Sequence, residues 1–334
     1  MNDFDRNYAA ILELVADTDA RFAAVKFPEL AELRDSAEAN LVRLVALMLL
    51  PACAAKSGGE EQVLVAKVIT SVTGNRPYVT AAEWQAVTDE LQNLRERART
   101  GDFQFVYVGE QAADPLAAVI KWYSATLDNT NELLRQGMDV LFASAIIMAY
   151  TMLEALSDDL WVKAVNLRPK TLAANVLATK ASKADDDQQP VIALSELRDF
   201  DFDLRDKMGT LLKRTKRVSL DSILAVKSAY HDAFWNPESP SKRRPCVALT
   251  AIFDGHLRDI FALESIRNIL VHQGGKIDDK FIKAMKGHTE FGEFTVGAKL
   301  LLSGHGVVHY VKSALNFSKA LLSFVDGWLV KYHE

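Results

Sequence analysis

Hydrophobic residues recur at three- and four-residue spacing along most of the chain, with polar residues between them. In residues 7–25 the pattern runs through Tyr8, Ile11, Leu12 and Val15. In residues 29–50 it runs through Leu30, Leu33, Ala37, Leu41 and Leu44. Because this spacing places apolar side chains on one face of an α-helix, both segments are predicted to be amphipathic helices.

The same pattern, together with start and stop signals, predicts a series of further helices. Thr80-Ala81-Ala82-Glu83 is a capping box that starts a helix reaching Arg99. Lys56-Ser57-Gly58-Gly59 predicts a turn between two helices, and proline-rich or polar stretches predict loops at 180–190 and 236–245. The other predicted helices span 41–55, 60–72, 138–165, 204–214, 219–235, 250–271, 278–286 and 309–328, and one begins at Asp114-Pro115. Residues 102–108 and 299–302 are expected to be extended or irregular.

These elements predict an all-α protein with two helical domains. Apolar character rises after Arg135-Gln136-Gly137, so the expected boundary separates residues 1–137 from residues 138–334. The chain has only 16 glycines and 9 prolines in 334 residues, which favours long helices over a β-protein with many tight turns.

Composition points to a reducing compartment. Cys53 and Cys246 are the two cysteines, and neither lies in a CxxC or Cys/His cluster, so a disulfide framework and a structural zinc site are not expected. The apolar stretch Val140–Leu153 is shorter than a transmembrane helix requires, and no secretory signal is visible. We therefore expect a cytoplasmic protein without membrane association, metal or cofactor.

The net charge of −5 is unevenly distributed. Residues 1–137 contain 13 Lys+Arg and 20 Asp+Glu, a net charge of −7, whereas the remainder contains 26 and 24, a net charge of +2. The second half is thus the better place to look for an anionic partner such as RNA. Lys213, Arg214 and Arg217 are candidate RNA-binding residues, as is Lys276, which precedes Lys280 and Lys283.

The strongest candidate site lies at the end of the helix predicted over 250–271. Glu264, Asn268 and His272 are spaced four residues apart and therefore share one helical face. Arg267 is close enough to reach the same face, and Gly274-Gly275 is a C-cap signal. The pattern predicts a carboxylate, a guanidinium, an amide and an imidazole on a rigid helical end.

Arg267, Asn268 and His272 resemble the hallmark of the HEPN superfamily, in which an arginine and a polar residue precede a histidine near a helix end. The helix around Leu153-Glu154 looks like the family's first core helix, and the helix 309–328 looks like its last. The resemblance covers residues 138–334 and implies a HEPN-like helical bundle preceded by a second helical domain. Residues 41–72 are similar to TerB-like helical domains, although Lys56-Ser57-Gly58-Gly59 replaces the usual acidic turn.

The resemblance implies a metal-independent endoribonuclease that works as a homodimer, as in toxins and phage-defence effectors, with an antitoxin or regulatory partner. The RNA 2′-hydroxyl would attack its own phosphate and give a 2′,3′-cyclic phosphate. His272 would transfer a proton, because an imidazole exchanges protons near neutral pH. Arg267 would bind phosphoryl oxygens, Asn268 would orient either group, and Glu264 would hold Arg267.

Two other interpretations remain open at this point. With 18 arginines and 7 histidines in the chain, the Arg-to-His spacing alone is close to chance. A Glu/Arg pair three residues apart is commonly a solvated ion pair, and a histidine at a helix end is commonly a favourable end charge. The alternative function is a non-catalytic HEPN-type module that binds RNA, nucleotide or protein. His288, His305 and His309 have no carboxylate or cysteine at metal-ligand spacing and are expected to be structural.

Overall fold

The computed structural model describes residues 22–73, 80–99, 132–183, 194–235 without 199, 202 and 205, and 244–332. These residues are almost entirely helical, which confirms the all-α prediction. The only β-type pairings among them are isolated bridges, Trp235 with Pro245 and Lys276 with Lys299. Residues 7–21 of the helix expected over 7–25, the extended segment at 102–108 and the helix after Pro115 lie outside the described residues.

The described residues fall into two compact units. One unit comprises residues 49–136 and the other comprises residues 22–48 together with 137–332. The junction at Gln136 and Gly137 coincides with the expected boundary, but residues 22–48 pack with the second unit. The hydrogen bonds between Asp326 and the Lys26 and Phe27 backbone illustrate this packing, which arises between residues 300 positions apart.

In the first unit, the second part of helix α2 (Ala31–Thr73) faces helix α3 (Ala81–Arg99). Their shared core contains Val68, Val87 and Leu94. The capping box is confirmed: the Thr80 backbone amide donates to Glu83 Oε2 at 2.9 Å, and the Glu83 amide donates to Thr80 Oγ1 at 3.4 Å.

The predicted turn at Lys56-Ser57-Gly58-Gly59 is wrong, because α2 continues through it without interruption. Two glycines cost a helix only about 1 kcal/mol each relative to alanine, and long helical segments precede and follow them. The predicted helix over 7–25 is also wrong at its end, since residues 22–25 are not helical. A 3-10 turn, η2 (Pro28–Leu30), with proline at its first position, leads directly into α2.

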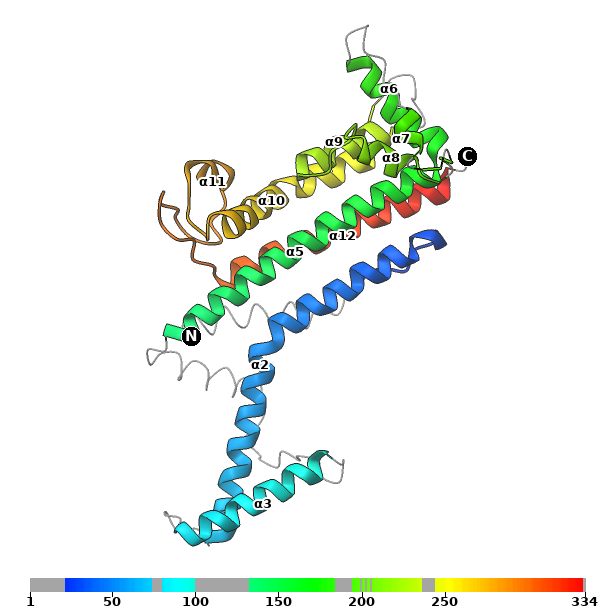
Figure 1. The fold of residues 1–334 in the computed structure, drawn as a ribbon. Helices are drawn as coiled ribbons and strands as arrows, with labels where there is room; N and C mark the ends of the chain where they lie inside the picture. The colour runs from blue at the N-terminus through cyan, green and yellow to red at the C-terminus, as the bar shows by residue number, and fades with distance from the viewer. Residues whose placement is uncertain are drawn as a thin grey trace. The chain divides into compact units, whose positions relative to one another are not determined.

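The second unit is built around three long helices, α5 (Glu132–Leu167), α10 (Val247–His272) and α12 (Gly304–Lys331), which Figure 1 shows with the shorter helices around them. Helix α9 (Ile223–Ala233) joins α5 to α10: Trp161 Nε1 donates to the Ala229 carbonyl, and Tyr230 Oη donates to the Ser157 carbonyl. The remaining elements are η3 (Pro169–Ala173), α6 (Ala174–Lys183), α7 (Leu194–Arg198), α8 (Met208–Arg214) and α11 (Asp279–Ala284).

Helix α5 extends well beyond the apolar stretch 140–153, which the sequence analysis judged too short to cross a membrane. Its segment Asp139–Leu167 is long and apolar enough to cross a membrane by length and composition alone. However, 56% of the apolar window is buried in the structure, and Ala145, Ile146 and Trp161 are completely inaccessible. This burial is typical of a helix whose apolar length is used by a protein core.

Helix α8 docks on α5 through a glycine, which yields a stability prediction. A Cβ atom at Gly209 would lie 2.5 Å from the Val162 carbonyl oxygen, a backbone atom that cannot rotate away. Gly209→Ala is therefore expected to lower the free energy of unfolding by about 1–3 kcal/mol, as overpacking does. Urea unfolding should show this loss, with Gly255→Ala as the control. A Cβ atom at Gly255 would have nothing within 4 Å, and alanine there favours the helix, so this variant should not be destabilised. Equal stability of the Gly209→Ala variant and the parent would contradict close docking.

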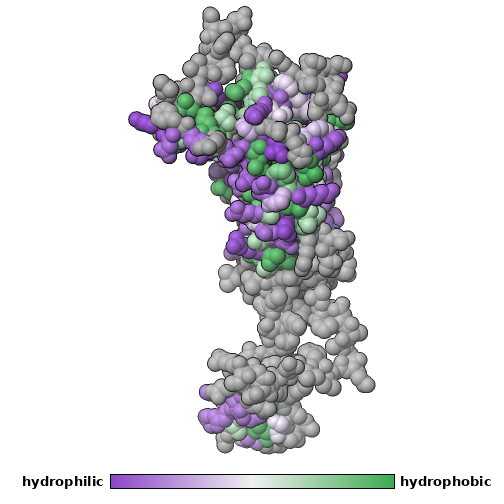
Figure 2. All heavy atoms as spheres, turned by 90° about the vertical axis from the view of Figure 1, so that its right-hand side faces the viewer, coloured by the Kyte–Doolittle hydropathy of each residue, from purple (hydrophilic) through white to green (hydrophobic). Residues whose placement is uncertain are grey.

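Exposed large apolar side chains of the second unit lie on several helices and in the segment before α12. On the face drawn in Figure 2, hydrophobic residues lie interspersed with hydrophilic ones. Val247, at the start of α10, is 74% exposed, and Leu301, in the segment between α11 and α12, is 68% exposed. Leu224 of α9 and Phe261 of α10 line the same pocket beside α10.

Candidate functional site

Helix α10 ends as the sequence predicts. His272 is its last residue, and Gly274 and Gly275 follow with φ of +59° and +81°, a conformation that glycine adopts without strain. The Gln273 and Gly275 amides both donate to the Ile269 carbonyl, at 3.0 and 2.9 Å. These bonds satisfy a terminal carbonyl, so the helical end that carries the motif is well capped.

Arg267 is held by two contacts, one within α10 and one with α5. Its Nη1 donates to Asn268 Oδ1 at 2.9 Å, and its guanidinium carbon lies 5.6 Å from the centroid of the Tyr150 ring on α5. A guanidinium over an aromatic face is attracted by the ring electrons. Arg267 Nε is buried and has no hydrogen-bond partner within the described part of the chain. The guanidinium is thus positioned but not saturated.

Glu264 is bound by partners other than the one expected. Its side chain is buried, and its Oε2 accepts a hydrogen bond from the Ile223 amide at 3.4 Å, at the start of α9. It also accepts from the Tyr150 hydroxyl. No hydrogen bond or ion pair joins it to Arg267 among the described residues. The expectation that Glu264 holds Arg267 directly is therefore corrected. Tyr150 contacts both side chains instead.

Burial raises the pKa of the Glu264 carboxyl, because desolvation disfavours its charged form, although the hydrogen bonds from Tyr150 and Ile223 oppose this. Burial, followed by the charge of Glu264, also raises the pKa of Tyr150. The phenol therefore acts as a hydrogen-bond donor that stays protonated beside the carboxylate.

The raised pKa of Glu264 predicts how stability changes with pH. The folded protein holds this proton more tightly than the unfolded chain, so the contribution of Glu264 to stability should decline as pH rises above the ordinary glutamate pKa of 4.5. Glu264→Gln removes this titration and should make the decline shallower. Melting temperatures of parent and variant between roughly pH 4 and 8 would test it. Parallel profiles for the two proteins would show that Glu264 does not titrate in this range.

His272 lies exposed in the last turn of α10. It is five residues beyond Arg267, which corresponds to about 7.5 Å of helical rise and a divergence of about 140° around the axis. Asn268 is also exposed. The three residues predicted to share one helical face differ in their surroundings: Glu264 is buried, Asn268 and His272 are exposed, and only Glu264 and Asn268 line a common pocket.

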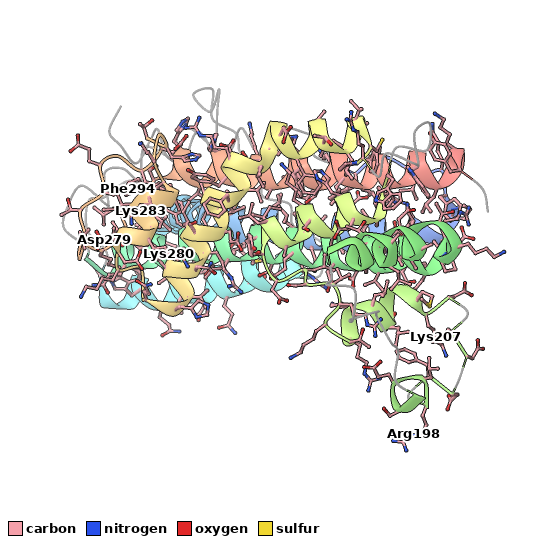
Figure 3. The ribbon with its side chains drawn as sticks, turned by 90° about the horizontal axis from the view of Figure 1, so that it is seen from above. Arg198, Lys207, Asp279, Lys280, Lys283 and Phe294 are labelled. Atoms are coloured by element: carbon pink, nitrogen blue, oxygen red, sulfur yellow. The ribbon has the colours of Figure 1, made fainter. Side chains whose placement is uncertain are left out.

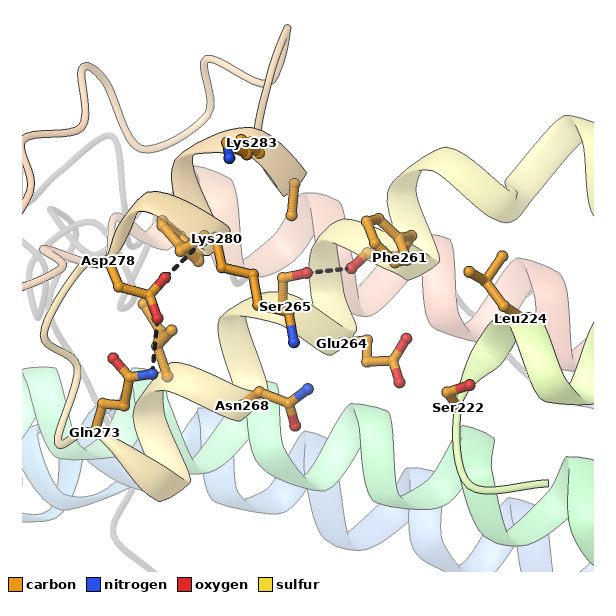
Figure 4. A pocket seen from close by; sticks show the side chains of 13 residues that line it. Ser222, Leu224, Phe261, Glu264, Ser265, Asn268, Gln273, Asp278, Lys280 and Lys283 are labelled. Carbon is orange, nitrogen blue, oxygen red and sulfur yellow. Dashed lines mark hydrogen bonds between the residues drawn. The ribbon is translucent and has the colours of Figure 1, made fainter. Parts of the chain in front are cut away.

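A pocket of about 500 Å³ opens beside this helix and takes in part of the motif. Figure 4 shows Glu264, Ser265 and Asn268 of α10 on one side of it, the start of α9 on another, and α11 opposite. Arg267 and His272 do not line it. Its lining residues are Ser222, Leu224, Phe261, Glu264, Ser265, Asn268, Ile269, Gln273, Asp278, Lys280, Phe281, Lys283 and Ala284.

The candidate RNA-binding residues are not gathered around the motif. Lys213 pairs with Asp158, about 12 Å along α5 from Tyr150. Arg214 lies over the Phe200 ring, with Arg217 just beyond α8. Lys276 is exposed and follows the glycine cap. In Figure 3, Lys280 and Lys283 lie at the α11 end of the unit, and Lys207 lies at the other end.

A second polar cluster was missed by the sequence analysis. His288 Nδ1 lies 3.7 Å from Glu290 Oε2, and His309 Nε2 lies 3.5 Å from Asp259 Oδ2. Tyr310 Oη lies 3.2 Å from both His288 Nδ1 and Glu290 Oε2. Sequence spacing did not reveal these carboxylate neighbours: Asp259 comes from α10, and Glu290 lies two residues after His288 in the segment before α12. Burial lowers the pKa of His288. No group of three His, Cys, Asp or Glu among the described residues is arranged to hold a metal ion.

Comparison of the chain with protein-family models, with curated proteins and with solved structures gives no match. The residues of the α10 end therefore carry the functional argument by themselves.

Proposed function

We propose that this chain is a metal-independent endoribonuclease of the HEPN type. The observation that supports it best is the position of Arg267, which is oriented by Tyr150 and Asn268 on the same capped helical end as the exposed His272. A guanidinium so placed suits phosphoryl oxygens, and an exposed imidazole suits proton transfer.

The reaction needs two proton transfers. The RNA 2′-oxygen forms a bond to phosphorus and loses its proton, while the bond from phosphorus to the 5′-oxygen breaks and that oxygen gains a proton. The products are a 2′,3′-cyclic phosphate and a 5′-hydroxyl. One imidazole removes the first proton and a second imidazole supplies the other.

A second copy of the chain completes this site in our proposal. Arg267 and His272 diverge by about 140° around α10, so one copy does not surround a phosphate with both groups. A homodimer in which two α10 ends face each other would supply both imidazoles and two guanidinium groups. The same proposal places the protein in the cytoplasm, as an RNA-directed toxin or defence effector, with an antitoxin or regulatory partner.

A non-catalytic RNA- or nucleotide-binding module is the second candidate function. The observation that favours it is the pocket, which takes in Glu264 and Asn268 but neither Arg267 nor His272. Binding at this pocket would not by itself require proton transfer.

Incubation of the full chain with total RNA in EDTA tests the first function. We expect fragments that end in 2′,3′-cyclic phosphate. Retention of RNA on the protein without fragments would support the second function instead, and neither binding nor fragments would overturn both.

A further inference from the structure

The pocket between α9, α10 and α11 has the size and wall composition of a ligand site. Its volume of about 500 Å³ lies within the range of about 300–1,000 Å³ that is usual for small-molecule sites. Phe261 is 36% exposed although it lies on a core helix. Together with Leu224, Ile269 and Phe281 it gives the pocket apolar walls that suit a flat aromatic ring.

Two polar groups on adjacent turns of α10 face this apolar space in Figure 4. Asn268 Oδ1 already accepts from Arg267, which leaves the Asn268 amide nitrogen to donate. Glu264 is an acceptor: its carboxylate accepts from the Ile223 amide at Oε2 and from the Tyr150 hydroxyl, and a carboxylate has about four lone-pair sites, so it keeps capacity for a further donor. An acceptor and a donor side by side match the edge of a nucleobase, which offers a donor next to an acceptor.

Cationic groups lie at the α11 side of the same pocket. Lys280 and Lys283 both line it and are exposed, and neither forms a salt bridge with another described residue. The Asp278 carboxylate caps α11 at Phe281 and accepts from Gln273, and the charge of Lys280 acts on it without forming an ion pair. The two ammonium groups are therefore left to meet an anion such as a phosphate.

We infer that this pocket binds one nucleotide, with its base between the apolar walls against Glu264 and Asn268 and its phosphate at Lys280 and Lys283. The inference deepens the proposed function and rests on it for the source of that nucleotide, a unit of the RNA chain next to the cleaved bond. The pocket then selects which base lies beside the Arg267 and His272 motif.

Binding of the four ribonucleoside 5′-monophosphates to the full chain, measured by titration calorimetry, tests the inference apart from cleavage. At least one of them is expected to bind, and ribose 5-phosphate is expected to bind at least tenfold more weakly, because it lacks a base. Lys283→Glu should weaken binding about tenfold or more. Lys286→Glu, which makes the same change close by but outside the pocket, should leave it unchanged.

A second variant fills the pocket without altering its charges. Ser265→Trp places a large side chain inside it, and nucleotide binding should be lost while the helical circular dichroism signal stays. A short RNA competing with the bound mononucleotide identifies RNA as the source, whereas absence of competition assigns the pocket to free nucleotides and overturns its role in RNA selection.

The inference is overturned if none of the four nucleotides binds, if ribose 5-phosphate binds as tightly as they do, or if Ser265→Trp binds like the parent. These results are distinguishable from failure of the proposed function. RNA cleavage without mononucleotide binding would leave the nuclease proposal intact, and mononucleotide binding without cleavage would leave the pocket intact.

Discussion

Alanine in place of His272 is expected to lower cleavage of total RNA in EDTA by about 100- to 10,000-fold, the usual contribution of a general acid or base. His272 is exposed, so the substitution opens no cavity and removes no buried hydrogen bond. The loss should therefore appear in the rate and not in the melting temperature. Arg267 keeps its contacts with Tyr150 and Asn268, and RNA binding should persist.

His305→Ala is the matched control for this experiment. His305 is also an exposed histidine near a helix end, but it lies in the first turn of α12 and not on α10. Its variant should cleave RNA like the parent. If His272→Ala also cleaved RNA like the parent, proton transfer by His272 would be excluded. Equal slowing of growth on expression of His272→Ala and of the parent would exclude it as well.

Replacement of Asp326 by alanine is expected to lower the free energy of unfolding by about 2–4 kcal/mol, because hydrogen bonds to a charged group contribute about 1.5–3 kcal/mol each. The buried Asp326 carboxylate on α12 accepts from the Lys26 amide at 2.9 and 3.0 Å and from the Phe27 amide at 2.7 Å. Without it, two amides lose their acceptor. The segment before α2 should then separate from the second unit, together with the Phe27 ring beneath Arg168.

Hydrogen exchange provides the specific measurement for Asp326. The Lys26 and Phe27 amides should exchange much faster in Asp326→Ala, and urea unfolding should shift to lower concentration. Glu29→Gln is the control, since Glu29 is an exposed carboxylate in the same segment and surface changes usually stay within about 0.5 kcal/mol. Unchanged protection of the two amides would show that Asp326 does not retain this segment.

Local rules account for the parts of the fold that were predicted correctly. The capping box at Thr80, the glycine cap after His272 and the long helices α5, α10 and α12 depend on residues within a few positions of one another. The same rules overestimated how strongly the glycines at 58 and 59 interrupt a helix. A local cost of about 1 kcal/mol for each glycine does not end a helix that is favoured on both sides.

The candidate site likewise has a part that the sequence predicted and a part that it did not. Sequence spacing identified Glu264, Arg267, Asn268 and His272 as one group on one helix, and it identified the capped end that carries them. It did not identify Tyr150, which lies on α5 and contacts both Arg267 and Glu264. A signal for this role was absent, since an aromatic residue within an apolar helix is usually part of the core.

By itself, the sequence determined that this protein is helical, where most of the long helices lie, and which short segment concentrates polar chemistry. These properties follow from hydrogen bonds and side-chain periodicity over a few residues. Only the tertiary structure decided that Glu264 is buried, that Phe261 faces a pocket, and that Asp259 and Glu290 meet two histidines. Each of these depends on which helices approach each other, a choice made by the packing of the whole unit and not by any local pattern.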